Sequence, residues 1–302
     1  MQEDSKPTKA GRLRRTIDPF GDLYVAISRA VIEHERLIAP DIELRQTYAY
    51  TFAHPMLATS PPIHERAHHP APLHAVSTPG VIEEATVEMV LRRQSESNVD
   101  RLIQSQNIVS LIRLVAGSPV RAPICSNIPF SKMSEIKDVT VMQLEPPMDW
   151  PIHPVPLNDN LLTAIEKLLD PMQVLLHCDQ FNSAFNLANS VWWLPSFNAQ
   201  MIAIWAAAEA LMRPGRQDMT KQLARSIRAY SGTSSGQGDK LYQRVIHLCK
   251  ARGEAAHAGH QPKPEDVQES FFILRSILLR ALSEGAAPGP IETITPLWNS
   301  SY

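Results

Sequence analysis

Residues 239–257 read DKLYQRVIHLCKARGEAAH, and this stretch decides the fold of the second half of the chain. Leu241, Val245 and Leu248 recur at steps of four and three, which is the spacing of one face of an α-helix. The next member at helical spacing is Arg252, so a charge continues an apolar stripe. Burying such a charge is expensive unless it is paired or lies at an interface. We therefore expect a helix whose last turns carry a paired or functional arginine.

The helical period extends to both sides of this stretch. A group of prolines marks a boundary ahead of it: Pro146, Pro147, Pro151, Pro154 and Pro156. After them, six segments have helical periodicity: Asn160–Leu176, Phe181–Val191, Phe197–Met212, Lys221–Tyr230, Asp239–His257 and Pro264–Leu282. The sequence predicts an all-α bundle over residues 155–284, followed by a Gly/Pro-rich tail over 285–302. Gly232, Gly236 and Gly238 are expected in a Ser/Gly loop before the fifth of these helices.

Strand signals dominate the first half of the chain. β-Branched and aromatic residues with partial alternation predict strands over residues 24–32, 41–52, 81–93 and 138–145. Apolar residues at steps of three and four predict a helix over 98–116. We expect one mostly antiparallel sheet packed by that helix, in an N-terminal domain over 21–150. The predicted fold class is therefore α+β, a sheet domain followed by a helical bundle.

Two segments of this first half are predicted to lack regular structure. Residues 1–20 are polar and basic, with Arg12, Arg14 and Arg15 close together, and are expected to form a disordered tail; a nucleic-acid-binding arm is the alternative. Six prolines fall within residues 53–80, which predicts a long loop or an insertion that is exposed and mobile.

Composition excludes several classes of protein. The chain has 302 residues, 44% of them hydrophobic and 20% charged, which is typical of globular domains and argues against disorder and coiled coils. Three widely spaced cysteines do not form a disulfide framework and fit a reducing compartment. The longest apolar stretch, residues 191–212, contains Pro195, Asn198, Gln200 and Glu209, which disfavours a membrane span. We expect a soluble, cytoplasmic protein that does not enter a membrane.

The net charge of −2 hides a strongly basic segment. Between Arg213 and Arg252 there are nine basic residues and two acidic ones, a net charge of +7 that leaves −9 for the rest of the chain. Helical spacing places Lys221, Arg225 and Arg228 on one face and pairs Lys240 with Arg244. A concentrated basic surface is typical of phosphate binding, although a solvated face of an ordinary bundle is the alternative.

The end of the 239–257 stretch resembles a known motif. Arg252-Gly-Glu-Ala-Ala-His257, late in a basic helix of an all-α bundle, resembles the Arg-x4-His motif of HEPN domains. The preceding helix, IAIWAAAEALM with Glu209 near its end, is similar to the Ala-Leu-Glu-Ala-Leu stretch of the Apea-like HEPN group. The segment LYQRVIHLCKARGEAAHAG is also similar to that group, and the N-terminal half resembles the sheet-containing region that these proteins carry ahead of the bundle.

The resemblance implies a metal-independent ribonuclease that cleaves RNA through the ribose 2′-OH, without a cofactor. Histidine suits proton transfer near neutral pH, and a guanidinium suits the charge that gathers on the phosphate. On this interpretation Arg252 holds the phosphate, His257 moves the proton and Glu209 orients Arg252. The implied contacts to the RNA backbone are Lys221, Arg225, Arg228, Lys240, Arg244 and Lys250. The implied partners are RNA, a second copy of the chain bound through the bundle, and a protein bound by the N-terminal domain. Family members often act as toxins or in anti-phage defence.

Two positions depart from the family pattern and keep other functions open. Gly253 stands where the family commonly has a polar residue, and Ala258 separates His257 from Gly259. Gly253 favours a non-catalytic RNA- or nucleotide-binding module. A third hypothesis is a dimeric protein-interaction subunit, in which Glu209 and Arg252 form a structural ion pair.

Two further groups of residues have the composition of binding sites. His64, His68, His69 and His74 lie near Glu65, but the prolines among them argue against the helix that a zinc site would need, so no metal is expected. The segment SGTSSGQGDK over 231–240 lacks the Gly-Lys-Ser/Thr ending of a P-loop and is interpreted as a linker.

Overall fold

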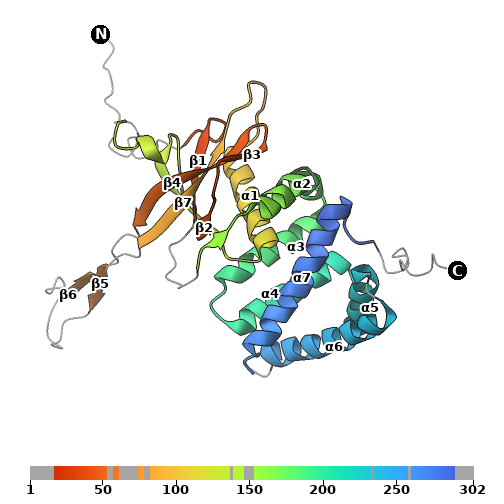
Figure 1. The fold of residues 1–302 in the computed structure, drawn as a ribbon. Helices are drawn as coiled ribbons and strands as arrows, with labels where there is room; N and C mark the ends of the chain where they lie inside the picture. Colours follow the sequence, from red (N-terminus) through yellow and green to blue (C-terminus); the bar gives the residue numbers. More distant parts are fainter. Residues whose placement is uncertain are drawn as a thin grey trace, which may run out of the picture. The chain divides into compact units, whose positions relative to one another are not determined.

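The computed structural model describes residues 17–52, 57–60, 74–77, 82–136, 139–145, 153–232, 234–257 and 260–289. The chain divides into two compact units (Figure 1). The first comprises Met1–Val109 and Val120–Leu162, and the second comprises Ser110–Pro119 and Thr163–Tyr302. Strands are found in the first unit and most helices in the second, which confirms the α+β class.

The first unit is built on a six-stranded antiparallel sheet. Its strand order is β3 (Arg36–Ala39), β4 (Ile42–Phe52), β7 (Ile82–Leu91), β1 (Leu23–Ser28), β8 (Arg121–Ser126) and β9 (Val141–Gln143). β1 lies between β7 and β8, and its Leu23, Val25, Ala26 and Ile27 are fully buried. Such a continuous apolar run is expected of a strand that is covered on both faces. Separately, β2 (Ala30–Val31) pairs in parallel with β10 (Val155–Pro156).

The expected strands are present, but with several corrections. β3 was not predicted, and the strand predicted over 138–145 is shortened to β9. The strand predicted over 24–32 is divided into β1 and β2 because Arg29 adopts a left-handed backbone conformation, with φ +60°. The prediction that 53–80 lacks regular structure was wrong in part, since β5 (Leu57–Ser60) and β6 (His74–Ser77) pair there in antiparallel fashion. Strand β8 was missed because it contains Pro123, a residue that sequence reasoning excludes from sheet interiors.

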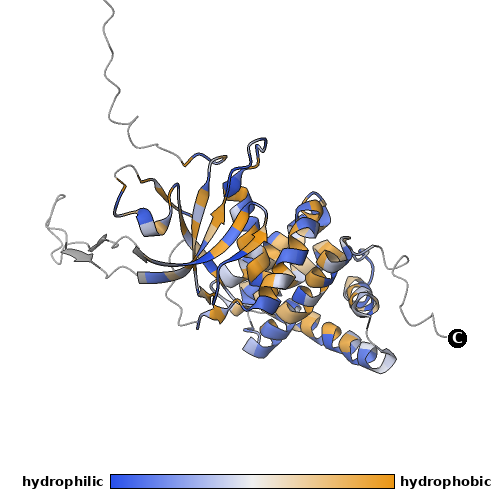
Figure 2. Ribbon diagram, turned by 45° about the horizontal axis from the view of Figure 1, so that its top comes forward, coloured by the Kyte–Doolittle hydropathy of each residue, from blue (hydrophilic) through white to orange (hydrophobic). Residues whose placement is uncertain are grey.

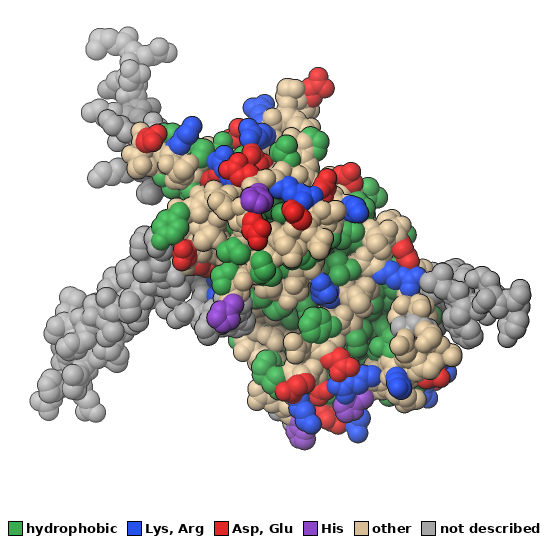
Figure 3. Space-filling view, in the orientation of Figure 1, with side chains coloured by type: hydrophobic (Ala, Val, Ile, Leu, Met, Phe, Trp, Pro, Cys, Tyr) green, Lys and Arg blue, Asp and Glu red, His purple; other side chains and the backbone are tan. Residues whose placement is uncertain are grey.

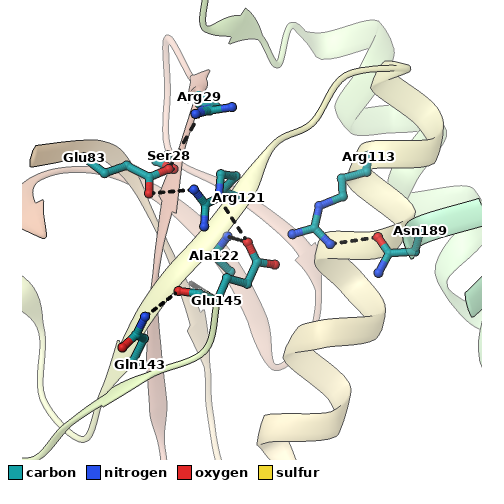
Figure 4. Close-up of polar contacts among 9 residues, drawn as sticks. All are labelled: Ser28, Arg29, Glu83, Arg113, Arg121, Ala122, Gln143, Glu145 and Asn189. Atoms are coloured by element: carbon teal, nitrogen blue, oxygen red, sulfur yellow. Dashed lines mark hydrogen bonds and ion pairs between the residues drawn. The ribbon is translucent and has the colours of Figure 1, made fainter. Parts of the chain in front are cut away.

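A buried cluster of charged side chains joins strands of the sheet (Figure 4). Fully buried Arg121 on β8 contacts Glu83 on β7 at 3.1 Å and Glu145 at 3.5 Å. The hydroxyl of Ser28 donates to the other oxygen of Glu83 at 2.5 Å, and Arg29 approaches that oxygen at 3.9 Å. Both registers of β1 shift at Ser28, so the cluster lies at a β-bulge. The sequence carries no signal for a shared role of Glu83 and Glu145, because 62 residues separate these two partners of one arginine.

Helix α1 (Arg101–Ala116) begins in the first unit and ends in the second. Asp100 accepts hydrogen bonds from the amides of Leu102 and Ile103, which is a standard N-cap. At the other end, Arg275 donates to the carbonyls of Leu114 and Val115, both at 2.6 Å, and so satisfies groups that a helix end leaves free. Burial lowers the pKa of Arg275.

The six predicted helices of the second half are confirmed to within a few residues. They are α2 (Asp159–Leu175), α3 (Asp179–Ser190), α4 (Phe197–Met212), α5 (Met219–Ser231), α6 (Ser235–His257) and α7 (Pro264–Glu284). The expected Ser/Gly loop was too long, since α6 already begins at Ser235 and includes Gly236 and Gly238. Gly232 does end α5, with φ +65°.

Helix α4 forms the centre of the second unit. It contacts α3, α5, α6 and α7, as expected of a helix that is apolar around most of its circumference. Its Met201, Ile204, Trp205 and Leu211 are almost fully buried. Figure 2 shows apolar residues gathered where the helices of this unit meet and polar residues on their outer faces. A charged residue on α4 therefore stands out.

Candidate functional site

Glu209 is that charged residue, and it is held in the last turn of α4. The turn closes with Arg213 in a left-handed conformation, φ +46°, whose amide donates to the Glu209 carbonyl at 2.9 Å. The Glu209 side chain meets Arg252 of α6, whose Nη1 donates to Oε1 at 2.8 Å. Each of the two side chains is 24% exposed. The pair is thus partly desolvated but still reached by solvent.

Cys249 lies beside this ion pair, one turn before Arg252 on α6. Burial raises the pKa of its thiol to about 12; Arg252 acts in the opposite direction and Glu209 in the same direction. The thiol is therefore a protonated neighbour of the pair rather than a reactive thiolate.

His257 is the last residue of α6 and is exposed. The helix continues without interruption from Arg252 through Gly253 to His257. Five residues on a regular helix correspond to a rotation of about 140° and a rise of about 7.5 Å. Arg252 and His257 therefore leave the helix on different sides. The structure brings Arg252 together with Glu209, but it does not place His257 on their face of α6.

Asn198 holds the end of α6 and was not anticipated from the sequence. Its Nδ2 donates to the carbonyl of Ala255 at 3.2 Å and to the carbonyl of His260 at 3.4 Å. Asn198 is the second residue of α4, directly after the helix start at Ser196–Phe197. An asparagine at a helix start has many possible roles, so the sequence carried no signal for this contact.

The cations expected to contact RNA are spread over α5 and α6, and most of them meet carboxylates. Lys221 lies 4.0 Å from Asp218, and Arg228 lies 2.9 Å from Asp239. Lys250 lies 3.8 Å from Glu254.

Arg244 is the most strongly paired of these cations. It contacts Asp266 at 2.7 Å and Glu269 at 2.5 Å, both on α7. Arg225 and Lys240 are exposed, and among the described residues neither forms an ion pair. Figure 3 shows basic and acidic side chains interspersed over the lower helices rather than a continuous basic stripe. The basic segment of the sequence is thus partly neutralised in the fold.

Within the described ranges, no group of three or more His, Cys, Asp or Glu residues could hold a metal ion. His64, Glu65, His68 and His69 lie outside those ranges, as do the basic residues near the N-terminus. In the parts of the chain that the structure describes, no helix combines the length and apolarity needed to cross a bilayer.

Comparison with known proteins adds no relative. No protein-family model, curated protein or solved structure matches this chain. The functional argument therefore rests on the residues themselves.

Proposed function

We propose that the helical unit is a metal-independent ribonuclease of the HEPN type, with Arg252, His257 and Glu209 as its site. The observation that supports the proposal is the Arg252–Glu209 ion pair, formed next to the helix end that carries an exposed histidine. A guanidinium has five N–H donors, and the bond to Glu209 uses Nη1. Donors are therefore left for a phosphate, and Glu209 limits the orientations that the guanidinium can adopt.

The proposed chemistry is attack of a ribose 2′-oxygen on the adjacent phosphorus. His257 accepts the 2′-OH proton as the 2′-oxygen bonds to phosphorus, the P–O5′ bond breaks to leave a 2′,3′-cyclic phosphate, and the departing 5′-oxygen takes up a proton from water. Arg252 stabilises the negative charge that gathers on the phosphoryl oxygens. None of these steps requires a metal ion.

The divergence of Arg252 and His257 on one helix is the reason to include a second copy in the proposal. A homodimer through the bundle places the Arg252 of one chain near the His257 of the other, and two-fold association is the commonest symmetry of oligomers. Light scattering at micromolar concentration is expected to give the mass of a dimer. A monomeric mass would contradict this arrangement.

The experiment compares cleavage of RNA by the wild type, by His257→Ala and by His247→Ala, with EDTA present. His247 is a second exposed histidine on α6 and is the matched control. Loss of a positioned acid–base group lowers the rate about 10²–10⁴-fold, so His257→Ala is expected to lose cleavage and to keep RNA binding. His247→Ala is expected to cleave at the wild-type rate. Equal cleavage by the wild type and His257→Ala would reject the site.

A second candidate, a dimeric protein-interaction subunit, is favoured by the carboxylates beside Lys221, Arg228, Arg244 and Lys250. These carboxylates compete with phosphates for the cations. RNA binding that weakens steeply with salt supports the ribonuclease or a non-catalytic RNA-binding module over the interaction subunit, because cations that bind phosphates release counterions from RNA. A dimer that binds no RNA even at low salt supports the interaction subunit. We place the ribonuclease in the cytoplasm, with a role as a toxin or in anti-phage defence.

A further inference from the structure

The end of α6 depends on a side chain from another helix. The last four carbonyls of an α-helix have no partner within that helix and need other donors. At the end of α6, one such donor is the side-chain amide of Asn198 on α4. It donates to the carbonyl of Ala255, inside the last turn, and to the carbonyl of His260, beyond the helix. The backbone on both sides of His257 is thereby held to α4.

Asn198 is itself firmly placed. The Ser196 hydroxyl accepts a hydrogen bond from the Ala199 amide at 3.2 Å and caps the turn in which Asn198 lies. The following residues Met201, Ile204 and Trp205 are buried, so this part of α4 is fixed by packing.

The same helix also holds the other half of the site. Asn198 and Glu209 are eleven residues apart. On a regular helix this spacing is three full turns plus about 20°, so the two side chains point in nearly the same direction. Both side chains therefore lie on one face of α4 and reach α6. Glu209 holds the guanidinium of Arg252, and Asn198 holds the turn of His257.

We propose that Asn198 is a positioning residue for His257, and that α4 sets the relative placement of the histidine and Arg252. The inference rests on the proposed ribonuclease function. Asn198 acts through the backbone of the last α6 turn and has no contact with the reacting atoms. Without it, the last turn frays, and His257 leaves the position from which it transfers the proton.

The test uses Asn198→Asp, which keeps the shape of the side chain and removes its N–H donors. The matched control is Gln200→Glu, two residues along α4, whose amide donates to the Leu194 carbonyl at 3.1 Å. Each substitution removes an amide group that donates to backbone carbonyls, two bonds for Asn198 and one for Gln200, and adds one negative charge in the first turns of α4. Of these bonds, only those of Asn198 hold the end of α6. Asn198→Ala serves as a second variant that removes the donors without adding charge.

Two measurements are made on each full-length variant: RNA cleavage kinetics, and hydrogen exchange of the amides of residues 254–257. Misplacement of a catalytic group by about 1 Å lowers the rate up to about 100-fold. Asn198→Asp and Asn198→Ala are therefore expected to lower kcat about 10- to 100-fold with KM within about twofold of the wild type. Exchange in the last α6 turn is expected to be about fivefold faster, in line with the loss of one hydrogen bond. Gln200→Glu is expected to change neither.

The outcomes separate this inference from the proposed function. Wild-type kcat in Asn198→Asp, or an equal loss in Gln200→Glu, would overturn the positioning role even if the protein cleaves RNA. Unchanged hydrogen exchange in both Asn198 variants would overturn it as well. If the wild type cleaves no RNA, the proposed function fails and the catalytic part of the inference fails with it. Hydrogen exchange then still decides whether Asn198 holds the turn.

Discussion

The ion pair between Arg252 and Glu209 allows a quantitative prediction. We consider Arg252→Met, Glu209→Gln and the double variant, which remove either charge or both and keep most of the side-chain volume. The two side chains are 24% exposed and bonded at 2.8 Å, so the pair is neither fully buried nor on the open surface. Exposed pairs contribute about 0.2–1 kcal/mol, whereas breaking a buried pair costs about 3–5 kcal/mol. We expect a coupling energy of about 1.5–2 kcal/mol between these limits.

The assay is denaturant unfolding of the four proteins that make up this double-mutant cycle. Either single variant is expected to lose about 1.5–3 kcal/mol, because it leaves a partly desolvated charge unpaired. For a domain of this size, that corresponds to a fall in Tm of about 3–10 °C. The double variant is expected to be more stable than the sum of the two losses indicates, since it leaves no unpaired charge.

The control cycle uses Arg228 and Asp239, which join α5 to α6 at 2.9 Å but are 36% and 67% exposed. Its coupling energy is expected to be about 0.5 kcal/mol or less, and salt is expected to weaken it further. Equal coupling energies in the two cycles would refute the argument from burial. So would a coupling energy below about 0.5 kcal/mol for Arg252 and Glu209.

Two further predictions concern neighbours of the pair on α6. Gly253→Ala is expected to raise the free energy of unfolding by about 0.5–1 kcal/mol, because the added Cβ meets no atom within 4 Å and alanine is the better helix former; a loss of stability in denaturant unfolding would contradict this. The Cys249 thiol has its pKa raised from 9.0 to about 12, so alkylation by iodoacetamide at pH 8, followed by mass spectrometry, is expected to be slower there than at half-buried Cys178. The folded state binds the thiol proton more tightly than the unfolded state does. The contribution of Cys249 to the free energy of unfolding is therefore fully present below about pH 9 and is lost as the pH rises toward 12. Reaction of Cys249 as fast as that of Cys178 would show that the thiol is not shielded.

Sequence reasoning succeeded where structure depends on neighbours along the chain. The helices from α2 to α7 follow the three- and four-residue period of their apolar residues, and their ends follow local signals such as Gly232 and Pro264. The contact between Glu209 and Arg252 also agrees with the sequence hypothesis, because a charge on each of two apolar helices needs a partner.

Most other contacts between distant segments were decided only by the tertiary structure. The basic segment has a charge of +7 in the sequence, yet Asp266 and Glu269 reach Arg244 from α7, and the sequence pattern does not show which face of α7 meets α6. In the same way, β8 gains its place from pairing with β1 despite Pro123.

The sequence by itself determined the helices from α2 to α7, the strands β1, β4, β7 and β9, and which helix carries Arg252 and His257. Only the tertiary structure decided that Asn198 holds the end of α6, and that Arg121 joins Glu83 to Glu145. The physical reason is that periodicity depends on the geometry of one segment, whereas a hydrogen bond across 57 residues depends on how two helices pack against each other.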